Sequence, residues 1–112
     1  MAIPKNLRLT KKSDFKFLLD TGNSKYLSFA KVKISKTPNN KNKPRFAVVV
    51  SKAVDSKATE RNKARRKITN TILQIMTISP ILSYDYIFFT NNKVKTVSKE
   101  IIFSQINSII IK

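Results

Sequence analysis

Residues 55–68 read DSKATERNKARRKI, and this stretch indicates both how the chain folds and what it binds. From Lys57 to Lys67 it holds six basic residues and one acid, Glu60. Apolar residues recur at intervals of three and four, the spacing of one helix face. They are Ala64, Ile68, Ile72, Ile75 and Met76. We therefore predict one helix with a packed C-terminal half and a cationic N-terminal half.

The predicted helix spans residues 57 to about 77, with Asp55 or Ser56 as its N-cap. Helical spacing places Arg61 and Arg65 on the same side as the apolar stripe, but nearer the N-terminus. Burying unpaired arginines is costly. We therefore expect the first turns to overhang the edge of a sheet or to line an open cleft.

Composition predicts one globular domain with a polyanionic partner. The chain has 112 residues, is 41% hydrophobic, and carries 23 Lys and Arg against 6 Asp and Glu, a net charge of +17. Nucleic acid is the favoured partner and an anionic membrane surface is a distant second. The chain has no His and no Cys, and it contains neither an apolar signal core nor a run of 18 apolar residues. We expect a cytoplasmic protein without a membrane or protein partner, a single domain over 1–112, and flexible residues 1–6.

The segment before the helix predicts one helix and two strands. Residues 10–20 show helical spacing, with Thr10 or Ser13 as the cap, and Gly22 would end this helix in a left-handed conformation. The face that would pack consists of Phe15, Leu18 and Leu19. Residues 27–35 alternate as a strand.

That strand has one apolar face, which consists of Ala30, Val32 and Ile34. Its other face would present Phe29, Lys31 and Lys33, either to stack a base and hold phosphates or as an ordinary polar face. Residues 36–44 would close a hairpin to the strand 45–52. The continuous apolar run of that second strand predicts a central strand buried on both faces.

The remaining segments complete an α+β fold. Residues 83–90 predict an aromatic-rich strand, and residues 96 or 98 to 111 predict a final helix with Ile102, Ile106, Ile109 and Ile110 on one side. The order is helix, strand, strand, long helix, strand, helix, with room for one more strand in the first half. We expect a compact sandwich of one β-sheet with three helices.

Autonomous catalysis is not expected. The acids are dispersed, namely Asp14, Asp20, Asp55, Glu60, Asp85 and Glu100. A two-metal nuclease needs carboxylates that converge on its ions. A single glycine cannot form a phosphate-binding loop. We predict no catalytic residue and no metal held by the protein.

The cationic half of the helix instead indicates RNA binding. The N-terminus of a helix carries the positive pole of its dipole and suits phosphates. Arginine forks hold phosphates by two hydrogen bonds, and Asn62 can bond a base edge or a 2′-hydroxyl. The alternative is a solvated helix face. Such a face normally interleaves acids at i, i+4, whereas Glu60 is the only acid here.

Residues 60–66, ERNKARR, shortly after VSK at 50–52, resemble the signature of the bacterial ribonuclease P protein subunit. Further segments fit in order, and the resemblance covers about residues 7 to 110. They are Arg8-Leu9 with Lys11 and Lys12, Asp14-Phe15 followed by Gly22, and residues 85–89. The departures are Lys63 for the usual Arg, Arg65 for the usual Lys, Ala53 for a second Lys, Asn91 for a common Arg, and Leu19 for a frequent aromatic. At Lys63 the charge is kept and the bidentate fork is lost.

The resemblance implies a protein that binds a catalytic RNA and the 5′ leader of precursor tRNA. The RNA, with bound Mg²⁺, would hydrolyse the leader, and no cofactor would be held by the protein alone. The expected contacts with the RNA subunit are Lys52, Lys57, Arg61, Asn62, Lys63, Arg65, Arg66 and Lys67. The expected leader contacts are Phe15, Phe29, Lys31 and Arg8, in a cleft between the sheet and the first helix. The resemblance also implies a left-handed βαβ crossover.

Two other functions remain open on composition alone. One is a structural ribosomal or other RNA-binding protein without a processing role. The other is a DNA-binding protein that inserts the helix at residues 61–66 into a major groove. A major-groove reader would prefer duplex DNA and depend on its sequence. A ribonuclease P subunit would prefer its structured RNA and substrates that keep a 5′ leader.

Overall fold

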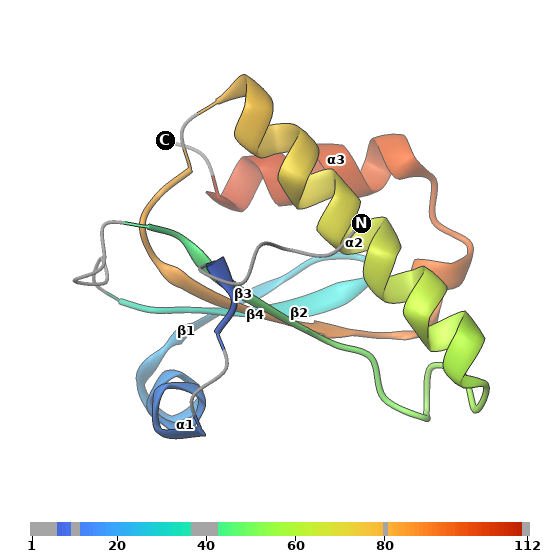
Figure 1. Cartoon of the computed structure of the whole chain (residues 1–112), viewed down its shortest axis with the longest axis horizontal. Helices are drawn as coiled ribbons and strands as arrows, with labels where there is room; N and C mark the ends of the chain where they lie inside the picture. The colour runs from blue at the N-terminus through green and yellow to red at the C-terminus, as the bar shows by residue number, and fades with distance from the viewer. Residues whose placement is uncertain (1–6, 10–11, 37–42, 80, 111–112) are drawn as a thin grey trace.

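A computed structural model of the chain shows a four-stranded sheet with α2 and α3 on one face and α1 on the other (Figure 1). The structure describes residues 7–9, 12–36, 43–79 and 81–110. Its elements are α1 (Lys12–Thr21), β1 (Asn23–Tyr26), β2 (Ala30–Ile34), β3 (Arg45–Val49), α2 (Ala58–Ile78), β4 (Asp85–Thr90), the 3₁₀-helix η2 (Asn92–Lys95) and α3 (Lys99–Ile110). This confirms the predicted α+β class and element order. The expected flexibility of residues 1–6 and the capping role of Thr10 lie outside the described residues.

The sheet has the strand order β1-β2-β4-β3. The β1–β2 and β2–β4 pairs are antiparallel, whereas β3 and β4 are parallel neighbours joined through α2. In Figure 1, β3 is the edge nearest the viewer, the strands β3 and β4 both run from left to right, and α2 returns above them. The path from β3 through α2 to β4 is therefore left-handed, the hand that about 2% of such connections adopt.

Strand pairing corrects two predictions. The strands β2 and β3 do not form a hairpin, because β4 lies between them. The hairpin is formed by β2 with β1, a short polar strand that the sequence pattern did not indicate. Also, β3 is an edge strand, and Arg8 forms an isolated bridge to its Phe46. The apolar run of β3 packs on both faces because helices cover both sides of the sheet. The strand beside it, β4, lies in the interior of the sheet.

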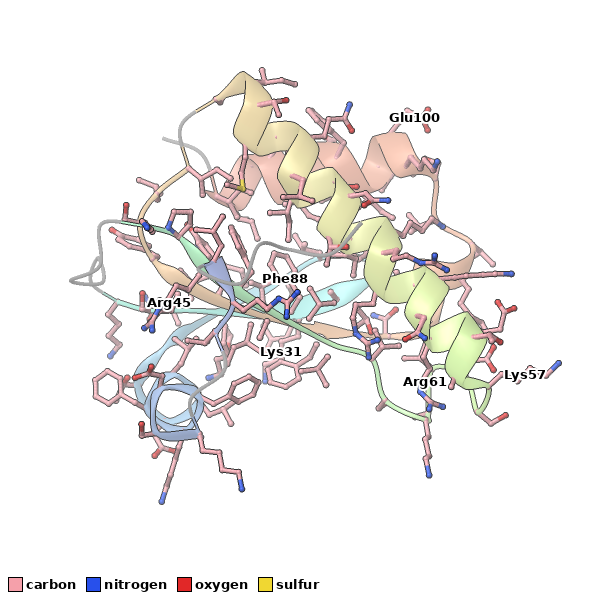
Figure 2. All side chains as sticks on the ribbon, in the orientation of Figure 1. Lys31, Arg45, Lys57, Arg61, Phe88 and Glu100 are labelled. Carbon is pink, nitrogen blue, oxygen red and sulfur yellow. The ribbon has the colours of Figure 1, made fainter. Side chains whose placement is uncertain are left out.

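Strand alternation divides the core into two clusters. Tyr86 and Phe88 on β4 face α2 and α3, while Ile87 faces α1 and packs with Leu9 and Leu18. The larger cluster lies under α2 and α3, where Phe88 is drawn in Figure 2. Within that cluster the rings of Phe46 and Tyr86 stack with centroids 5.2 Å apart. The packing of both sheet faces thus accounts for the continuous apolar runs of β3 and β4.

The predicted apolar stripe of α2 is confirmed. Ile68, Ile72 and Ile75 are fully buried, and Ala64 is 5% exposed. The predicted cap is wrong, since Lys57 is the N-cap residue and its side chain makes no capping bond. The Asp55 carboxylate instead accepts a hydrogen bond of 2.9 Å from the backbone N–H of the N-cap residue, Lys57, and not from an N–H inside the helix.

The end of α1 also differs from its prediction. Gly22 does not adopt the left-handed conformation. A Cβ at Gly22 would lie 2.6 Å from the Leu18 carbonyl oxygen and 3.0 Å from that of Ile34. Glycine is needed there because α1 approaches the end of β2 closely. On the packing face of α1, Leu18 is buried and Phe15 is half-buried as expected, but Leu19 is 41% exposed.

Candidate nucleic-acid interface

The cationic half of α2 begins at one end of the molecule, beyond the last residue of β3 (Figure 2). Arg61 is half-buried, and its Nη1 donates to the backbone carbonyls of Asp55 at 3.1 Å and Ser56 at 2.8 Å. These bonds bind the first turns of α2 to the preceding loop. The Arg61 side chain is therefore bonded by loop carbonyls rather than by an acid. Among the described residues, no carboxylate lies within 4.0 Å of its guanidinium to balance the charge.

The next turn carries a second anchored arginine. The Nη1 of Arg65 donates to the Asn62 side-chain oxygen at 2.7 Å. This bond orients the guanidinium and leaves the Asn62 amide N–H groups able to donate. Beside them, Arg66 is exposed, and Lys63 pairs with Glu60 at 3.4 Å. The structure thus brings these predicted contacts together on the solvent side of one helix.

Lys67 differs from the other predicted RNA contacts. Its half-buried ammonium donates to the backbone carbonyls of Val94 at 3.0 Å and Val97 at 2.9 Å. Two of its three N–H groups are therefore occupied within the protein. Lys67 ties α2 to the segment between η2 and α3, and it offers its charge more than its hydrogen bonds to a ligand.

The loop between β3 and α2 is held by Asp55. In addition to the Lys57 N–H, its carboxylate accepts a hydrogen bond from the Lys95 ammonium of η2 at 3.1 Å. These two groups, the backbone N–H first, lower the pKa of the Asp55 carboxyl below its usual value of 3.8. The exposed side chains of Lys52 and Lys57 extend from this fixed loop.

A second candidate surface lies on the other face of the sheet, beside α1. Cross-strand register aligns Tyr26, Lys31, Phe89 and Val49, one from each strand, and we call these residues the open row. The Lys31 ammonium lies 5.8 Å from the centroid of the Tyr26 ring, within the reach of a cation–π interaction. Tyr26 is 76% exposed. Tyr26 and Lys31 are exposed in this row, whereas Phe89 and Val49 are half-buried and pack against the smaller core cluster.

The placement of α1 explains why Tyr26 and Lys31 of the open row are exposed. Arg45, the first residue of β3, pairs with Asp14 of α1 at 3.2 Å and with Asp85 of β4 at 2.7 Å. The other end of α1 approaches the end of β2 at Ile34. Both contacts lie at the end of the sheet where β3 and β4 begin, so α1 crosses that end only (Figure 1). The carboxylates, Asp85 first, raise the already high pKa of Arg45, which keeps its charge at any ordinary pH.

The four predicted leader contacts lie in different environments. Lys31 is exposed in the open row, whereas Phe15 is half-buried and packs in the smaller core cluster. The prediction for Phe29 is wrong, because this side chain is fully buried under α2 and α3. Phe29 lies in a bend before β2 begins, so strand alternation does not apply to it. Arg8 is exposed and forms the bridge to Phe46.

The sequence patterns do not single out the two aromatic residues of the open row, Tyr26 and Phe89, as candidates for a binding surface. Tyr26 belongs to β1, which is too short and polar to show a strand pattern. The sequence places Phe89 in an aromatic-rich strand and does not indicate which face of the sheet it occupies. The pairing of Phe89 with Lys31 is what places Phe89 in the open row. That pairing joins strands that are far apart in sequence, so the local sequence does not indicate it.

The described part of the chain contains neither a cluster of metal-ligating side chains nor a helix that could span a membrane. No three His, Cys, Asp or Glu side chains gather there as a metal site. None of the helices there has the length and apolar character needed to span a membrane.

Comparison with known proteins gives the family. The sequence profile described as Ribonuclease P matches residues 3–112. A search of curated protein sequences finds no significant match.

Solved structures share the fold. A Staphylococcus aureus RNase P protein mutant with defective mRNA degradation activity superposes with a TM-score of 0.78 at 24% identity, over 94% of this chain and 86% of that one. The Thermotoga maritima RNase P protein in complex with 1-(4-fluorophenyl)-2-thiourea gives a TM-score of 0.75 at 20% identity, over 92% and 96%. With the profile match across nearly the whole sequence, these findings show that the chain belongs to the ribonuclease P family, as a bacterial protein subunit.

Proposed function

We propose that this chain binds the catalytic RNA of ribonuclease P through the cationic half of α2 and the 5′ leader of precursor tRNA along the open row. One observation carries the proposal. Val49, in the open row, is the last residue of β3, and the chain runs from it directly through the loop at 50–57 into α2. The two surfaces therefore meet at one end of the molecule, where a bound RNA subunit and the leader of its substrate would be adjacent.

The chemistry of each surface fits its partner. Arg61 and Arg65 present guanidinium groups that are oriented by hydrogen bonds, and such groups hold phosphate oxygens in pairs. In the open row, Tyr26 can stack on an unpaired base while Lys31 neutralises a phosphate. Stacking tolerates any base, so the leader would be held with little dependence on its sequence.

The protein would contribute binding, and the RNA would contribute the reaction. The described residues offer no carboxylate cluster that fits Mg²⁺. We place the Mg²⁺ ions on the RNA, where they would supply the activated water and stabilise the leaving oxygen. By holding the leader and neutralising phosphates nearby, the protein would lower the Mg²⁺ concentration needed for cleavage.

The test is reconstitution at low Mg²⁺ with a bacterial ribonuclease P RNA and precursor tRNA. We expect cleavage to be faster with the protein than without it, and the gain to shrink when the 5′ leader is shortened to one nucleotide. A rate that the protein does not change would refute the proposal. Binding to the RNA without any gain in cleavage would favour the structural RNA-binding alternative.

A further inference from the structure

A cationic groove opens between α2, η2 and the first turn of α3, on the flank of α2 away from Arg61 and Arg65. Its volume is about 500 Å³. The charged side chains that line it are Glu60, Lys63, Arg66, Lys67, Lys95 and Lys99. Lys95 and Lys99 are distant in sequence from the α2 motif, and the tertiary fold brings them to it.

The charges in this groove are only partly compensated. Glu60 pairs with Lys63, and Lys95 pairs with Asp55 behind the groove. Within the described residues, Arg66 and Lys99 have no acid within 4.0 Å, and Lys67 bonds only neutral carbonyls. Positive charge that gathers in a concave site concentrates the field there and attracts anions.

The walls of the groove are fixed before any ligand binds. Lys67 joins α2 to the two carbonyls at Val94 and Val97, and the Asp55–Lys95 pair holds η2 to the loop before α2. Val94 is fully buried beneath the groove floor. A preorganised site loses less conformational freedom on binding, which favours a rigid, highly charged ligand.

Lys99 has no evident role in stability. It lies in the first turn of α3, at the positive end of the helix dipole, where a cation is unfavourable. Its side chain is exposed and faces the groove. A bound anion would offset the unfavourable interaction between the Lys99 ammonium and the positive end of the α3 dipole.

The remaining lining residues select the kind of anion. They are Ala64, Asn70 and Val94, so none of the described residues that line the groove is an aromatic side chain that could stack a base. Lysine ammonium groups bind phosphates as point charges, and Asn70 can bond a ribose hydroxyl. From these features we propose that the groove binds the sugar–phosphate backbone of the ribonuclease P RNA as a second contact, separate from the Arg61 and Arg65 flank. This inference rests on the proposed function.

The test compares Lys99→Gln with Lys93→Gln in titrations of the full-length protein with a bacterial ribonuclease P RNA across KCl concentrations. Lys93 is an exposed lysine of η2 that does not line the groove, so both variants lose one charge from the same region. We expect Lys99→Gln to reduce the log–log salt slope by about 0.7–0.9, which amounts to about fivefold weaker binding at 0.15 M salt. Lys93→Gln should leave the slope unchanged.

A second variant excludes misfolding as the cause of a loss. Glu60→Gln removes the one acid that lines the groove, so it should tighten RNA binding. Equal slopes for Lys99→Gln and Lys93→Gln, or no gain from Glu60→Gln, would overturn the groove contact while wild-type binding and stimulation of cleavage leave the proposed function intact. A wild-type protein that does not bind the RNA would overturn both.

Discussion

At the scale of single residues, the arginines of α2 combine a structural and a binding role in different proportions. Arg61 donates to two backbone carbonyls of the preceding loop, whereas Arg65 bonds only the exposed Asn62 side chain. The same type of side chain, one helical turn apart, thus has different consequences when removed.

We expect Arg61→Ala and Arg65→Ala each to lower the salt slope of RNA binding by about 0.7–0.9, because each removes one phosphate contact. Only Arg61→Ala should also lower the free energy of unfolding, by about 1 kcal/mol, since two loop carbonyls lose their donor. Salt-dependent RNA titration and urea unfolding measure the two effects. If both slopes stay at the wild-type value, this end of α2 is only a solvated face.

Tyr26 and Phe17 form a matched pair of exposed aromatic residues, at 76% and 67% exposure, and only Tyr26 lies in the open row. Tyr26→Ala should weaken binding of leader-bearing precursor tRNA to the reconstituted holoenzyme by about 1–3 kcal/mol, the value of one stacked base. Phe17→Ala should not. The same Tyr26 variant should bind mature tRNA like wild type. An equal loss for mature tRNA would assign Tyr26 to another part of the substrate.

At the scale of elements, two joints position the binding surfaces. One holds the start of α2 through Asp55 and Lys95, and the other holds α1 across the sheet through Arg45 and Gly22. Each of these two joints depends on a few specific contacts rather than on the repeating backbone hydrogen bonds of a helix or a sheet.

The α1 joint predicts a large effect for a small change. Gly22→Ala should lower the free energy of unfolding by about 1–3 kcal/mol, because the added Cβ would lie 2.6 Å from the Leu18 carbonyl oxygen, and backbone cannot move aside cheaply. Asn23→Ala, at the next and exposed position, is the control and should change stability little. Urea unfolding followed by circular dichroism measures both. Equal stabilities would show that the backbone around Gly22 can accept a Cβ and that glycine is not required there.

The Asp55 joint predicts a dependence on acid. Its pKa is lower in the folded state than the usual 3.8, so its contribution to stability is complete above about pH 5 and is lost as the pH falls through 3.8 and below. Asp55→Asn should be less stable than wild type at neutral pH, and the difference should shrink toward pH 2. Thermal unfolding from pH 7 to pH 2 measures it. A difference that does not vary with pH would mean that the carboxylate charge contributes nothing.

At the scale of the whole molecule, a net charge of +17 on 112 residues sets two opposite responses to salt. Like charges repel in the compact state, and salt screens that repulsion. RNA binding releases counterions and is weakened by salt.

Raising KCl from about 0.05 to 0.5 M should therefore raise the thermal unfolding midpoint of the free protein and lower its affinity for RNA, because the Debye length shortens from over 10 Å to under 5 Å. Differential scanning fluorimetry and RNA titration at matched salt concentrations test this. Added RNA at low salt should raise the midpoint more than KCl does, since it binds the folded state. A midpoint that falls with salt would mean that the ion pairs outweigh the repulsion.

The sequence by itself determined the elements whose signal is local. The helical period of Ala64 and the isoleucines that follow fixed α2 and its two halves, and the excess of Lys and Arg indicated the polyanionic partner. Local spacing does not specify which strands pair, so only the tertiary structure placed β4 between β2 and β3. The left-handed crossover was implied by the family resemblance and not by any local pattern, and the structure has that hand. The tertiary structure also buried Phe29, paired Lys31 with Phe89, and brought Lys99 to the groove beside α2. All of these features depend on contacts between residues that are far apart in sequence. The local sequence around each residue does not indicate which distant residue it will contact.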